Sequence, residues 1–254
     1  MDENPVVLEV DGPLARITLN RPEVLNAENM AWVRALEAAV RTVATEPEVR
    51  VVLVRGAGRA FCAGLDLEMM SREGMPDGFY EGQERAFREL ELMDKITIAA
   101  LHGYCIGGGL QLAISCDIRI CSTDCRLGLP AHQEGLFPAM AVFRLPRLIG
   151  LGPARRLILS GESIGPEEAL RLGLIDHLVP AERFGEGVAE VLTTYLDAPR
   201  TASAASKRLM GRALDAPFET VYRESLPLLA ECLASPDVES AREAWRRRGA
   251  ERHG

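Results

Sequence analysis

The chain begins with two runs of alternating apolar and polar residues, followed by a helical pattern. Residues 6–10 and 14–19 alternate around Asp11-Gly12-Pro13, which predicts a β-hairpin closed by that turn. From residue 27 to residue 44 the apolar positions recur every three or four residues, which predicts an amphipathic helix. The start of the chain is therefore expected to fold as strand, strand and helix.

Three later apolar segments predict the strands of a parallel sheet. Residues 51–54 are wholly apolar between Arg50 and Arg55, a pattern typical of a strand that is buried on both faces. Residues 96–101 and 118–121 predict two further strands, which a glycine run and a short apolar helix separate. This repeat of strand, turn and helix favours an α/β fold.

The remaining segments predict a loop and a helical region. Residues 71–85 are rich in glycine and charge without a period, so we expect a mobile loop that can cover a site, before a helix over residues 85–94. A boundary between Ala198 and Thr201 separates a core, residues 1–198, from a helical C-terminal region, residues 199–254. Beyond Pro153 we expect helices over residues 154–159, 166–172, 185–196, 202–214, 218–233 and 238–248.

Composition places the chain among water-soluble globular proteins. Hydrophobic residues make up 47% and charged residues 26% of the 254 residues, which is enough apolar side chain for a sizeable core. Aromatic residues account for only 5%, so that core is expected to be aliphatic. The formal charge of −8 repels a polyphosphate backbone and argues against nucleic acid as a partner.

The cysteines and the first residues indicate a cytoplasmic protein with reduced thiols and no bound metal. The start, MDENPVVLEV, lacks a basic segment and a continuous apolar segment, so no secretory signal is expected. The six cysteines form no C-x-x-C pair, and Cys121 and Cys125 have no nearby histidine to complete a zinc site. Residues 96–116 are apolar but contain His102, Gln111 and four glycines, which favours a strand, a turn and a helix over a membrane span.

Two glycine turns after predicted strands carry the strongest candidate chemistry. Gly107-Gly108-Gly109 stands between an apolar strand and an apolar helix, where backbone N–H groups can converge on a ligand. Ala63-Gly64 follows the strand over residues 51–54 and supplies a second tight turn at the carboxyl side of the sheet. Backbone donors from two such turns make an oxyanion hole. The alternative is that the glycines serve only the close packing of a helix against a strand.

These turns belong to a set of motifs that resembles the crotonase superfamily, the enoyl-CoA hydratase and isomerase family. In order along nearly the whole chain, the motifs are Asn20-Arg21-Pro22-Glu23-Val24-Leu25-Asn26-Ala27, Ala60-Phe61-Cys62-Ala63-Gly64-Leu65-Asp66-Leu67, Gly107-Gly108-Gly109, Cys116-Asp117-Ile118-Arg119 and Glu168-Ala169-Leu170-Arg171-Leu172-Gly173-Leu174-Ile175. The resemblance implies a crotonase (ClpP-like) spiral of ββα repeats, whose helical C-terminal region packs homotrimers that often pair into hexamers. It also implies a lyase or isomerase reaction on an acyl- or enoyl-CoA thioester, with coenzyme A as part of the substrate and no other cofactor.

The resemblance further implies roles for single residues. The backbone N–H groups of Leu65 and Gly108 correspond to the oxyanion hole that stabilises the enolate of the thioester. The positions that correspond to substrate or CoA contacts are Arg59, Ala63, Gly64, Asp66 and Gly107. Arg59 is expected to meet the phosphates of CoA or else to be a solvated arginine, and Asp66 is expected to stabilise its own turn.

The sequence departs from the family pattern at both acid/base positions. Gln111 stands in place of the first catalytic glutamate and Ala131 in place of the second. Neither an amide nor a methyl group exchanges protons at neutral pH, so standard hydratase chemistry is not expected from these positions, although Gln111 can still hold a water or a polar group of the substrate. The nearest candidate replacements are His132, whose ordinary pKa suits a base, and Glu134, whose pKa would rise if it were buried.

Other functions remain open at this point. Without both carboxylates the fold can bind acyl-CoA without turnover. It can also serve a decarboxylase or a hydrolase, because decarboxylation forms an enolate without a base. Gly161-Glu162-Ser163-Ile164-Gly165 matches the G-x-S-x-G nucleophile elbow of serine hydrolases, but a predicted helix precedes it where that motif needs a strand.

Overall fold

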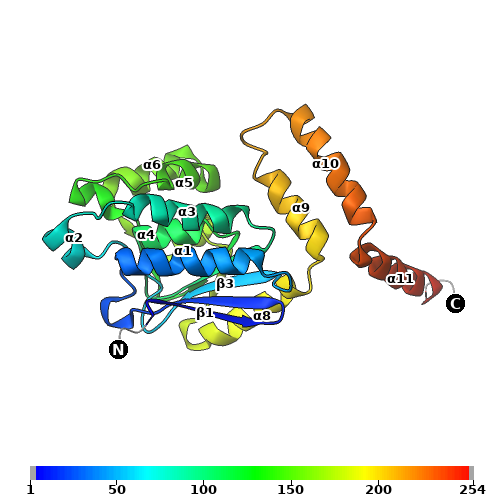
Figure 1. Cartoon of the computed structure of the whole chain (residues 1–254), viewed down its shortest axis with the longest axis horizontal. Helices are drawn as coiled ribbons and strands as arrows, with labels where there is room; N and C mark the ends of the chain where they lie inside the picture. The colour runs from blue at the N-terminus through cyan, green and yellow to red at the C-terminus, as the bar shows by residue number, and fades with distance from the viewer. Residues whose placement is uncertain (1–3, 252–254) are drawn as a thin grey trace. The chain divides into compact units, whose positions relative to one another are not determined.

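The computed structural model describes residues 4–251. They form two compact units, the first ending at Leu196 and the second beginning at Asp197. The first unit combines strands and helices, whereas the described residues of the second are helical, as Figure 1 shows. All residues of the candidate site belong to the first unit.

The larger sheet of the first unit has six strands in the order β1-β2-β3-β4-β6-β9. They are β1 (Val6–Asp11), β2 (Leu14–Leu19), β3 (Val51–Gly56), β4 (Ile96–Leu101), β6 (Ile118–Ser122) and β9 (His177–Val179). Strands β1 and β2 pair antiparallel with Asp11 opposite Leu14, and the other neighbouring pairs of this sheet are parallel. The predicted hairpin and the predicted parallel sheet are therefore confirmed.

Strand β3 is buried on both faces, as its sequence predicts. The helices that cover the two faces are α1 (Met30–Thr45) and α3 (Phe79–Leu92) on one side and α8 (Phe184–Leu196) on the other. Val52 and Val54 pack in the cluster that includes α1 and α3, while Val51 and Leu53 pack in the cluster that includes α8. The sheet is thus the middle layer between helices in Figure 1.

A second sheet has three short strands in the order β5-β7-β8. They are β5 (Tyr104–Ile106), β7 (Arg126–Gly128) and β8 (Ser163–Ile164). Strand β5 follows β4 and leads into helix α4 (Gly108–Ile114), which repeats the strand, strand and helix order of the first residues. The other helices are α2 (Leu67–Glu73), α5 (Ala141–Ile149), α6 (Leu151–Ser160), α7 (Pro166–Leu172), α9 (Arg200–Met210), α10 (Phe218–Leu233) and α11 (Pro236–Glu251), with 3-10 helices η1 (Pro22–Val24), η2 (Pro130–Glu134) and η3 (Ala181–Arg183).

The apolar stretch over residues 96–116 is divided among β4, β5 and α4. The predicted strand and helix are present, and the short strand β5 lies where only a turn was expected. Helix α4 contains 7 residues, all of them buried. Within residues 4–251, no helix has both the length and the apolar character needed to cross a bilayer.

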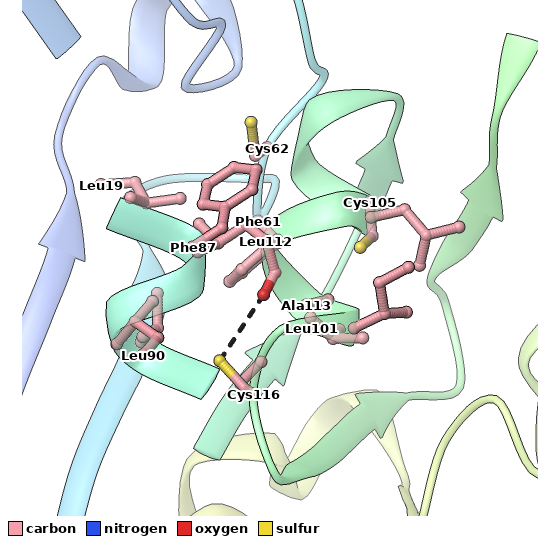
Figure 2. Packing of buried hydrophobic residues seen from close by; sticks show 14 of the residues in the cluster. Leu19, Phe61, Cys62, Phe87, Leu90, Leu101, Cys105, Leu112, Ala113 and Cys116 are labelled. Carbon is pink, nitrogen blue, oxygen red and sulfur yellow. Dashed lines mark hydrogen bonds between the residues drawn. The ribbon is translucent and has the colours of Figure 1, made fainter. Parts of the chain in front are cut away.

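Helix α4 packs against small side chains and thiols. Figure 2 shows Leu112 and Ala113 among these buried groups, with the thiol of Cys116 donating to the Leu112 carbonyl at 3.6 Å. A Cβ built on Gly109 would lie 2.5 Å from the carbonyl oxygen of Cys62 and 2.7 Å from its Cβ. The helix can therefore approach the segment after β3 because position 109 carries no side chain.

The structure corrects the predicted loop over residues 71–85. Residues 71–73 complete helix α2, and helix α3 begins at Phe79, after Gly78 with φ +77°. The loop prediction is therefore wrong at both ends, and the second helix begins before residue 85. Phe79, Gln83 and Phe87 are buried at helical spacing along α3. High glycine and charge content masked this period in the sequence.

The first predicted helix also begins later than its apolar spacing indicates. Helix α1 starts at Met30 rather than at residue 27, because the side-chain oxygen of Asn29 accepts from the N–H of Trp32 at 2.9 Å and caps the helix there. Leu25 and Asn26 adopt left-handed conformations, and Glu28 forms an isolated parallel bridge with Leu65. Glu28 therefore lies in the interior of the protein and not on the surface of a helix.

Alanine at position 109 tests how tightly α4 is packed. In Gly109→Ala the new Cβ meets the backbone of Cys62, so we expect the free energy of unfolding to fall by about 1–3 kcal/mol. Gly152→Ala in α6 is the matched control, because nothing lies within 4 Å of its built Cβ, and a gain of about 0.4–1 kcal/mol is expected there. Urea unfolding followed by circular dichroism measures both. Equal effects would contradict the packing argument.

Candidate active site

Two glycine turns, one after β3 and one after β5, approach each other closely. Gly64 (φ +86°) and Gly107 (φ +56°) adopt left-handed backbone conformations that favour glycine. A Cβ built on Gly64 would lie 2.7 Å from the carbonyl oxygen of Ile106 and 3.2 Å from the nitrogen of Gly108. The two segments meet because their backbones carry no side chains at the point of contact.

This approach leaves two backbone donors without protein acceptors. Around the first turn, Glu28 N donates to Gly64 O at 2.8 Å and Asp66 N donates to Glu28 O at 3.0 Å. Among residues 4–251, the N–H groups of Leu65 and Gly108 donate to no other protein atom. Gly108 is the first residue of α4, where a helix has no internal partner for its N–H groups. Leu65 and Gly108 line the same cavity.

The first turn is fixed by a buried amide. Asn26 is fully buried with φ +59°, and its Nδ2 donates to the carbonyls of Ala60 at 2.9 Å and Phe61 at 3.1 Å. Its Oδ1 accepts from the N–H of Arg21 at 2.8 Å. This side chain therefore ties the segment that leads to Gly64 to the loop after β2.

Asp66 caps α2 rather than facing a ligand. Its Oδ1 accepts from the N–H groups of Glu68 and Met69 at 3.1 Å each, and its Oδ2 pairs with Arg21 at 3.0 Å. Partial burial by itself raises the pKa of the Asp66 carboxyl, but the hydrogen bonds from Met69 and Arg21 outweigh it and hold that pKa below its ordinary value. The turn is thus stabilised by an ionised carboxylate.

A cavity of about 270 Å³ lies beside the two turns. Its polar side chains are Glu28, Tyr80, Gln83, Gln111 and Glu134. Its apolar lining includes Leu67, Met75, Phe79, Ile106, Leu136 and Phe137. One end of the cavity is therefore polar backbone and the rest is suited to an apolar group.

The cavity brings together most of the residues predicted from the sequence. Ala63, Leu65, Gly107, Gly108, Gln111 and Glu134 line it. Glu134 has an exposed side chain, so it lacks the burial that its expected role requires. Arg59 and His132 are exposed and do not line the cavity, and a Cβ built on Gly161 would overlap the His132 ring.

The structure adds Glu28, which the sequence patterns did not reveal. Glu28 is 1% exposed, and its Oε2 accepts from Gln83 Nε2 at 2.6 Å while its Oε1 accepts from the Cys62 thiol at 3.6 Å. A Cβ built on Gly108 would overlap this carboxyl group. Burial raises the pKa of the Glu28 carboxyl to about 8, against the lowering effect of the hydrogen bonds from Cys62 and Gln83. The group is therefore protonated at neutral pH.

Two wrongly predicted helix boundaries explain why the sequence patterns did not reveal Glu28 and Gln83 as a pair. The helix predicted from residue 27 includes Glu28, where a polar residue draws no notice, and the predicted loop includes Gln83. The available signal was an acid immediately after the motif that ends at Asn26-Ala27. Only the bridge to Leu65 shows that this acid is buried.

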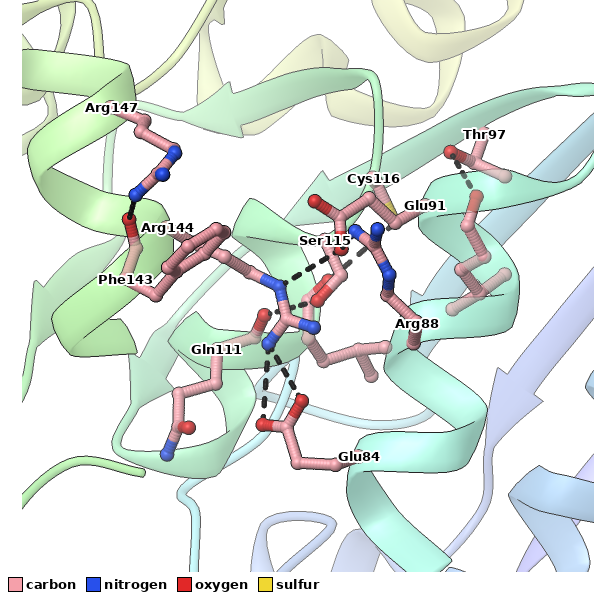
Figure 3. A network of polar contacts seen from close by, with 12 residues as sticks. Glu84, Arg88, Glu91, Thr97, Gln111, Ser115, Cys116, Phe143, Arg144 and Arg147 are labelled. Atoms are coloured by element: carbon pink, nitrogen blue, oxygen red, sulfur yellow. Dashed lines mark hydrogen bonds and ion pairs between the residues drawn. The ribbon is translucent and has the colours of Figure 1, made fainter. Parts of the chain in front are cut away.

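Gln111 lines the cavity and has a buried acceptor without a partner among the described residues. Gln111 is 6% exposed, and its Oε1 has no hydrogen-bond partner among the described residues. Figure 3 shows that nearby Arg144 is engaged by Glu84 at 2.9 Å and by Glu91 at 3.3 Å. The amide oxygen is therefore free to accept from a water or from a polar group of a ligand.

A wider groove of about 870 Å³ runs along residues of α1, α3 and α5. Its charged side chains pair with one another, as Arg85 does with Glu37 at 2.8 Å and Arg144 does with Glu84. None of the residues predicted for the site lines this groove. The smaller cavity is therefore the candidate active site.

The G-x-S-x-G segment does not form a nucleophile elbow. Ser163 is exposed in the two-residue strand β8, and helix α6 precedes it. The neighbouring Glu162 pairs with Arg156. Ser163 therefore lies within a strand rather than at the turn between a strand and a helix, where a nucleophile elbow would present it.

Comparison with known proteins gives the class to which this fold and cavity belong. Residues 9–251 match the family model described as enoyl-CoA hydratase/isomerase. The short-chain-enoyl-CoA hydratase of Clostridium acetobutylicum is 33% identical over 249 residues, which is 96% of this chain and 95% of that protein. The crotonyl-CoA hydratase of Syntrophomonas wolfei is 29% identical over 244 residues, 94% of each chain.

Solved structures agree with the sequence matches. The enoyl-CoA hydratase of Bacillus anthracis superposes with a TM-score of 0.90 at 26% identity, covering 96% of each chain. A Thermobifida fusca protein solved in complex with CoA superposes with a TM-score of 0.84 at 31% identity, covering 91% of this chain and 93% of that one. The chain belongs to the enoyl-CoA hydratase/isomerase family, and the predicted α/β crotonase fold with a helical C-terminal region is confirmed.

Glu28→Gln tests whether the buried carboxyl keeps its proton in the folded state. The pKa of Glu28 is about 8 in the fold and near the ordinary 4.5 in the unfolded chain, so between these values the unfolded chain loses a proton that the folded chain retains. The wild-type free energy of unfolding therefore falls as pH rises through this window, by at most about 1.4 kcal/mol per unit from this group.

The glutamine variant does not titrate at this position, so its stability relative to wild type should increase from about pH 5 to pH 8 and then level off. Urea unfolding at closely spaced pH values measures the difference. Gly152→Ala, which removes no titratable group, is the control and should show a flat difference. A flat difference for Glu28→Gln as well would show that its carboxyl titrates normally.

Proposed function

We propose that the protein is an enzyme that acts on acyl- or enoyl-CoA thioesters by stabilising an enolate. The observation that carries this proposal is the pair of N–H groups, on Leu65 and Gly108, that lack protein acceptors and line one cavity. Family membership supports a CoA thioester as the ligand, because the relatives named above are hydratases of enoyl-CoA substrates and one matched structure contains CoA.

The two N–H groups act as an oxyanion hole in this proposal. The thioester oxygen accepts from both of them, and it gains negative charge when the α-carbon loses a proton. Fixed donors in a water-poor cavity stabilise that charge more than they stabilise the ground state. One donor of this kind typically lowers the barrier by about 3 kcal/mol.

The acid/base chemistry must differ from that of a hydratase with two glutamates. Gln111 and Ala131 both line the cavity, and neither can transfer a proton at neutral pH. The unpaired oxygen of Gln111 suits a water or a hydroxyl group of the substrate instead. A lyase or isomerase reaction that moves a proton at the α-carbon through one carboxyl group fits these residues best.

The lining supports an uncharged acyl group. It includes no arginine, lysine or histidine from the part of the chain that the structure describes, and it carries the carboxyls of Glu28 and Glu134. A second carboxylate on the acyl group would meet these acids without a cation to pair with. A decarboxylase of malonyl-type thioesters is therefore the less favoured alternative. Arg59, exposed outside the cavity, is the proposed contact for the phosphates of CoA.

The helical C-terminal region is proposed to assemble homotrimers or hexamers. Helix α10 exposes large apolar side chains at helical spacing, and a second copy of the chain would cover them. The exposed residues of this face are Phe218, Tyr222, Leu226, Leu229 and Leu233. A cytoplasmic location is also proposed, because six cysteines without a C-x-x-C pair suit a reducing compartment.

Substrate profiling tests the proposed reaction class. The pure protein is incubated with short 2-enoyl-CoA, 3-enoyl-CoA, malonyl-CoA and methylmalonyl-CoA, while double-bond absorbance and products are followed. Turnover is expected for an uncharged enoyl thioester and not for the two carboxylated ones. Tight binding of every thioester without any turnover would favour a non-catalytic acyl-CoA-binding protein, and decarboxylation would overturn the assignment of an uncharged acyl group.

Gly108→Pro tests the backbone donor. Proline removes the N–H of residue 108, and we expect kcat to fall about 10²-fold or more below that of Gly108→Ala. The alanine variant is the matched control, because both substitutions add a Cβ that collides with Glu28 but only proline deletes the donor. Steady-state kinetics on the best enoyl thioester measures both variants. Equal kcat values would show that this N–H does not stabilise the transition state.

A further inference from the structure

We propose that Glu28 is the acid and base of this site, exchanging a proton with the α-carbon of the bound thioester, and that Gln83 positions its carboxyl group. The inference rests on the proposed function, because it needs a thioester oxygen held by Leu65 and Gly108. Glu28 lies outside the two positions at which the family resemblance leads one to expect catalytic glutamates.

The location of the carboxyl group is the first argument. Among the described residues, Glu28 and Glu134 are the carboxyl side chains on the cavity lining, and Glu28 is 1% exposed whereas Glu134 is exposed. The Glu28 carboxyl occupies the space that a side chain at Gly108 would need. A thioester oxygen that accepts from the Gly108 N–H has its α-carbon two bonds away. The α-carbon is therefore brought beside this carboxyl group.

The two oxygens of Glu28 have different surroundings. Oε2 accepts a short hydrogen bond, 2.6 Å long, from Gln83 Nε2 on helix α3. Oε1 has a long contact of 3.6 Å with the Cys62 thiol, which lies closer, at 3.2 Å, to the carbonyl of Asn26. One oxygen is thus held by an amide, and the other is left to carry the transferable proton.

The charges around Glu28 do not compensate its burial. The titratable or charged groups near it or on the same lining are Cys62, Cys105, Arg21, Glu134 and Tyr80. Burial raises the pKa of both thiols, which keeps them neutral, and Arg21 forms its ion pair with Asp66. A buried carboxyl without a cation costs stability that an apolar side chain would not, and such groups concentrate at catalytic sites.

The proposed step balances without any further reactant. The C–H bond at the α-carbon breaks, the proton binds Oε1 of ionised Glu28, and the electron pair moves to the thioester oxygen held by Leu65 and Gly108. Return of the proton from Glu28 to the enolate carbon reverses the step. Between the two events the carboxyl proton exchanges with solvent, so a saturated thioester takes up deuterium from D₂O at its α-carbon.

Deuterium exchange into butyryl-CoA tests this proposal without requiring hydration. Loss of the α-methylene signal in D₂O is followed by NMR, and binding of butyryl-CoA is measured separately by calorimetry. In wild type the exchange rate should rise as pH increases through about 8, because the ionised form of Glu28 removes the proton and its pKa is raised to about 8 by burial. Glu28→Gln should exchange at least about 10²-fold more slowly with unchanged affinity for butyryl-CoA.

Gln83→Leu separates a positioning role from a purely structural one. The hydrogen bond from Gln83 lowers the pKa of Glu28, so its removal should slow exchange and move the midpoint of the pH profile above the wild-type value. A merely structural contribution would lower the amount of folded protein and leave that midpoint in place. Glu48→Gln, which removes an exposed carboxyl outside the cavity lining, is the control and should exchange at the wild-type rate.

The outcomes separate this inference from the function on which it rests. Failure of wild type to bind butyryl-CoA would overturn the proposed function and the inference together. Binding without exchange in wild type, or exchange by Glu28→Gln at the wild-type rate and pH profile, would overturn the inference alone. A deficit in both Glu28→Gln and Glu134→Gln would assign the proton transfer to the pair rather than to Glu28, which contradicts the proposal as stated.

Discussion

The contact between two backbone turns is the constraint on which the rest of the site depends. Gly64 and Gly108 approach so closely that a Cβ on either would meet backbone or a carboxyl group. This approach leaves the N–H groups of Leu65 and Gly108 without protein acceptors beside one cavity. The paired strands bring the two turns together, and a single methyl group at their meeting point would separate them.

The space left at Gly108 also determines where the acid can lie. The carboxyl of Glu28 fills that space, and Gln83 reaches it from α3. Helix α3 comes close enough because Gly82 faces α1, where a built Cβ would lie 2.8 Å from a methyl carbon of Val33. A glycine in each of two different contacts therefore serves one buried hydrogen bond.

A catalytic acid at Glu28 explains in physical terms how a family member can carry Gln111 and Ala131 at the two usual acid/base positions. The oxyanion hole is built from backbone, so it tolerates changes of side chain around it. The acid/base group needs only to reach the α-carbon, and both Gln111 and Glu28 line the cavity. Gln111 retains a polar acceptor, while Glu28 supplies a carboxyl whose raised pKa suits proton transfer near neutral pH.

The sequence by itself determined the hairpin, the buried strand β3, the glycine turns and the family, because each depends on local periodicity or on motifs that survive without knowledge of contacts. It also located Leu65, Gly108, Gln111 and Glu134 on what proves to be one lining. It did not determine where α1 and α3 begin, since the cap at Asn29 interrupts an apolar spacing that starts earlier, and the glycine and charge content around Gly78 hides the period of α3. Only the tertiary structure decided that Glu28 is buried and Glu134 is exposed, because burial depends on which strand or helix lies opposite, and sequence patterns carry no record of that neighbour.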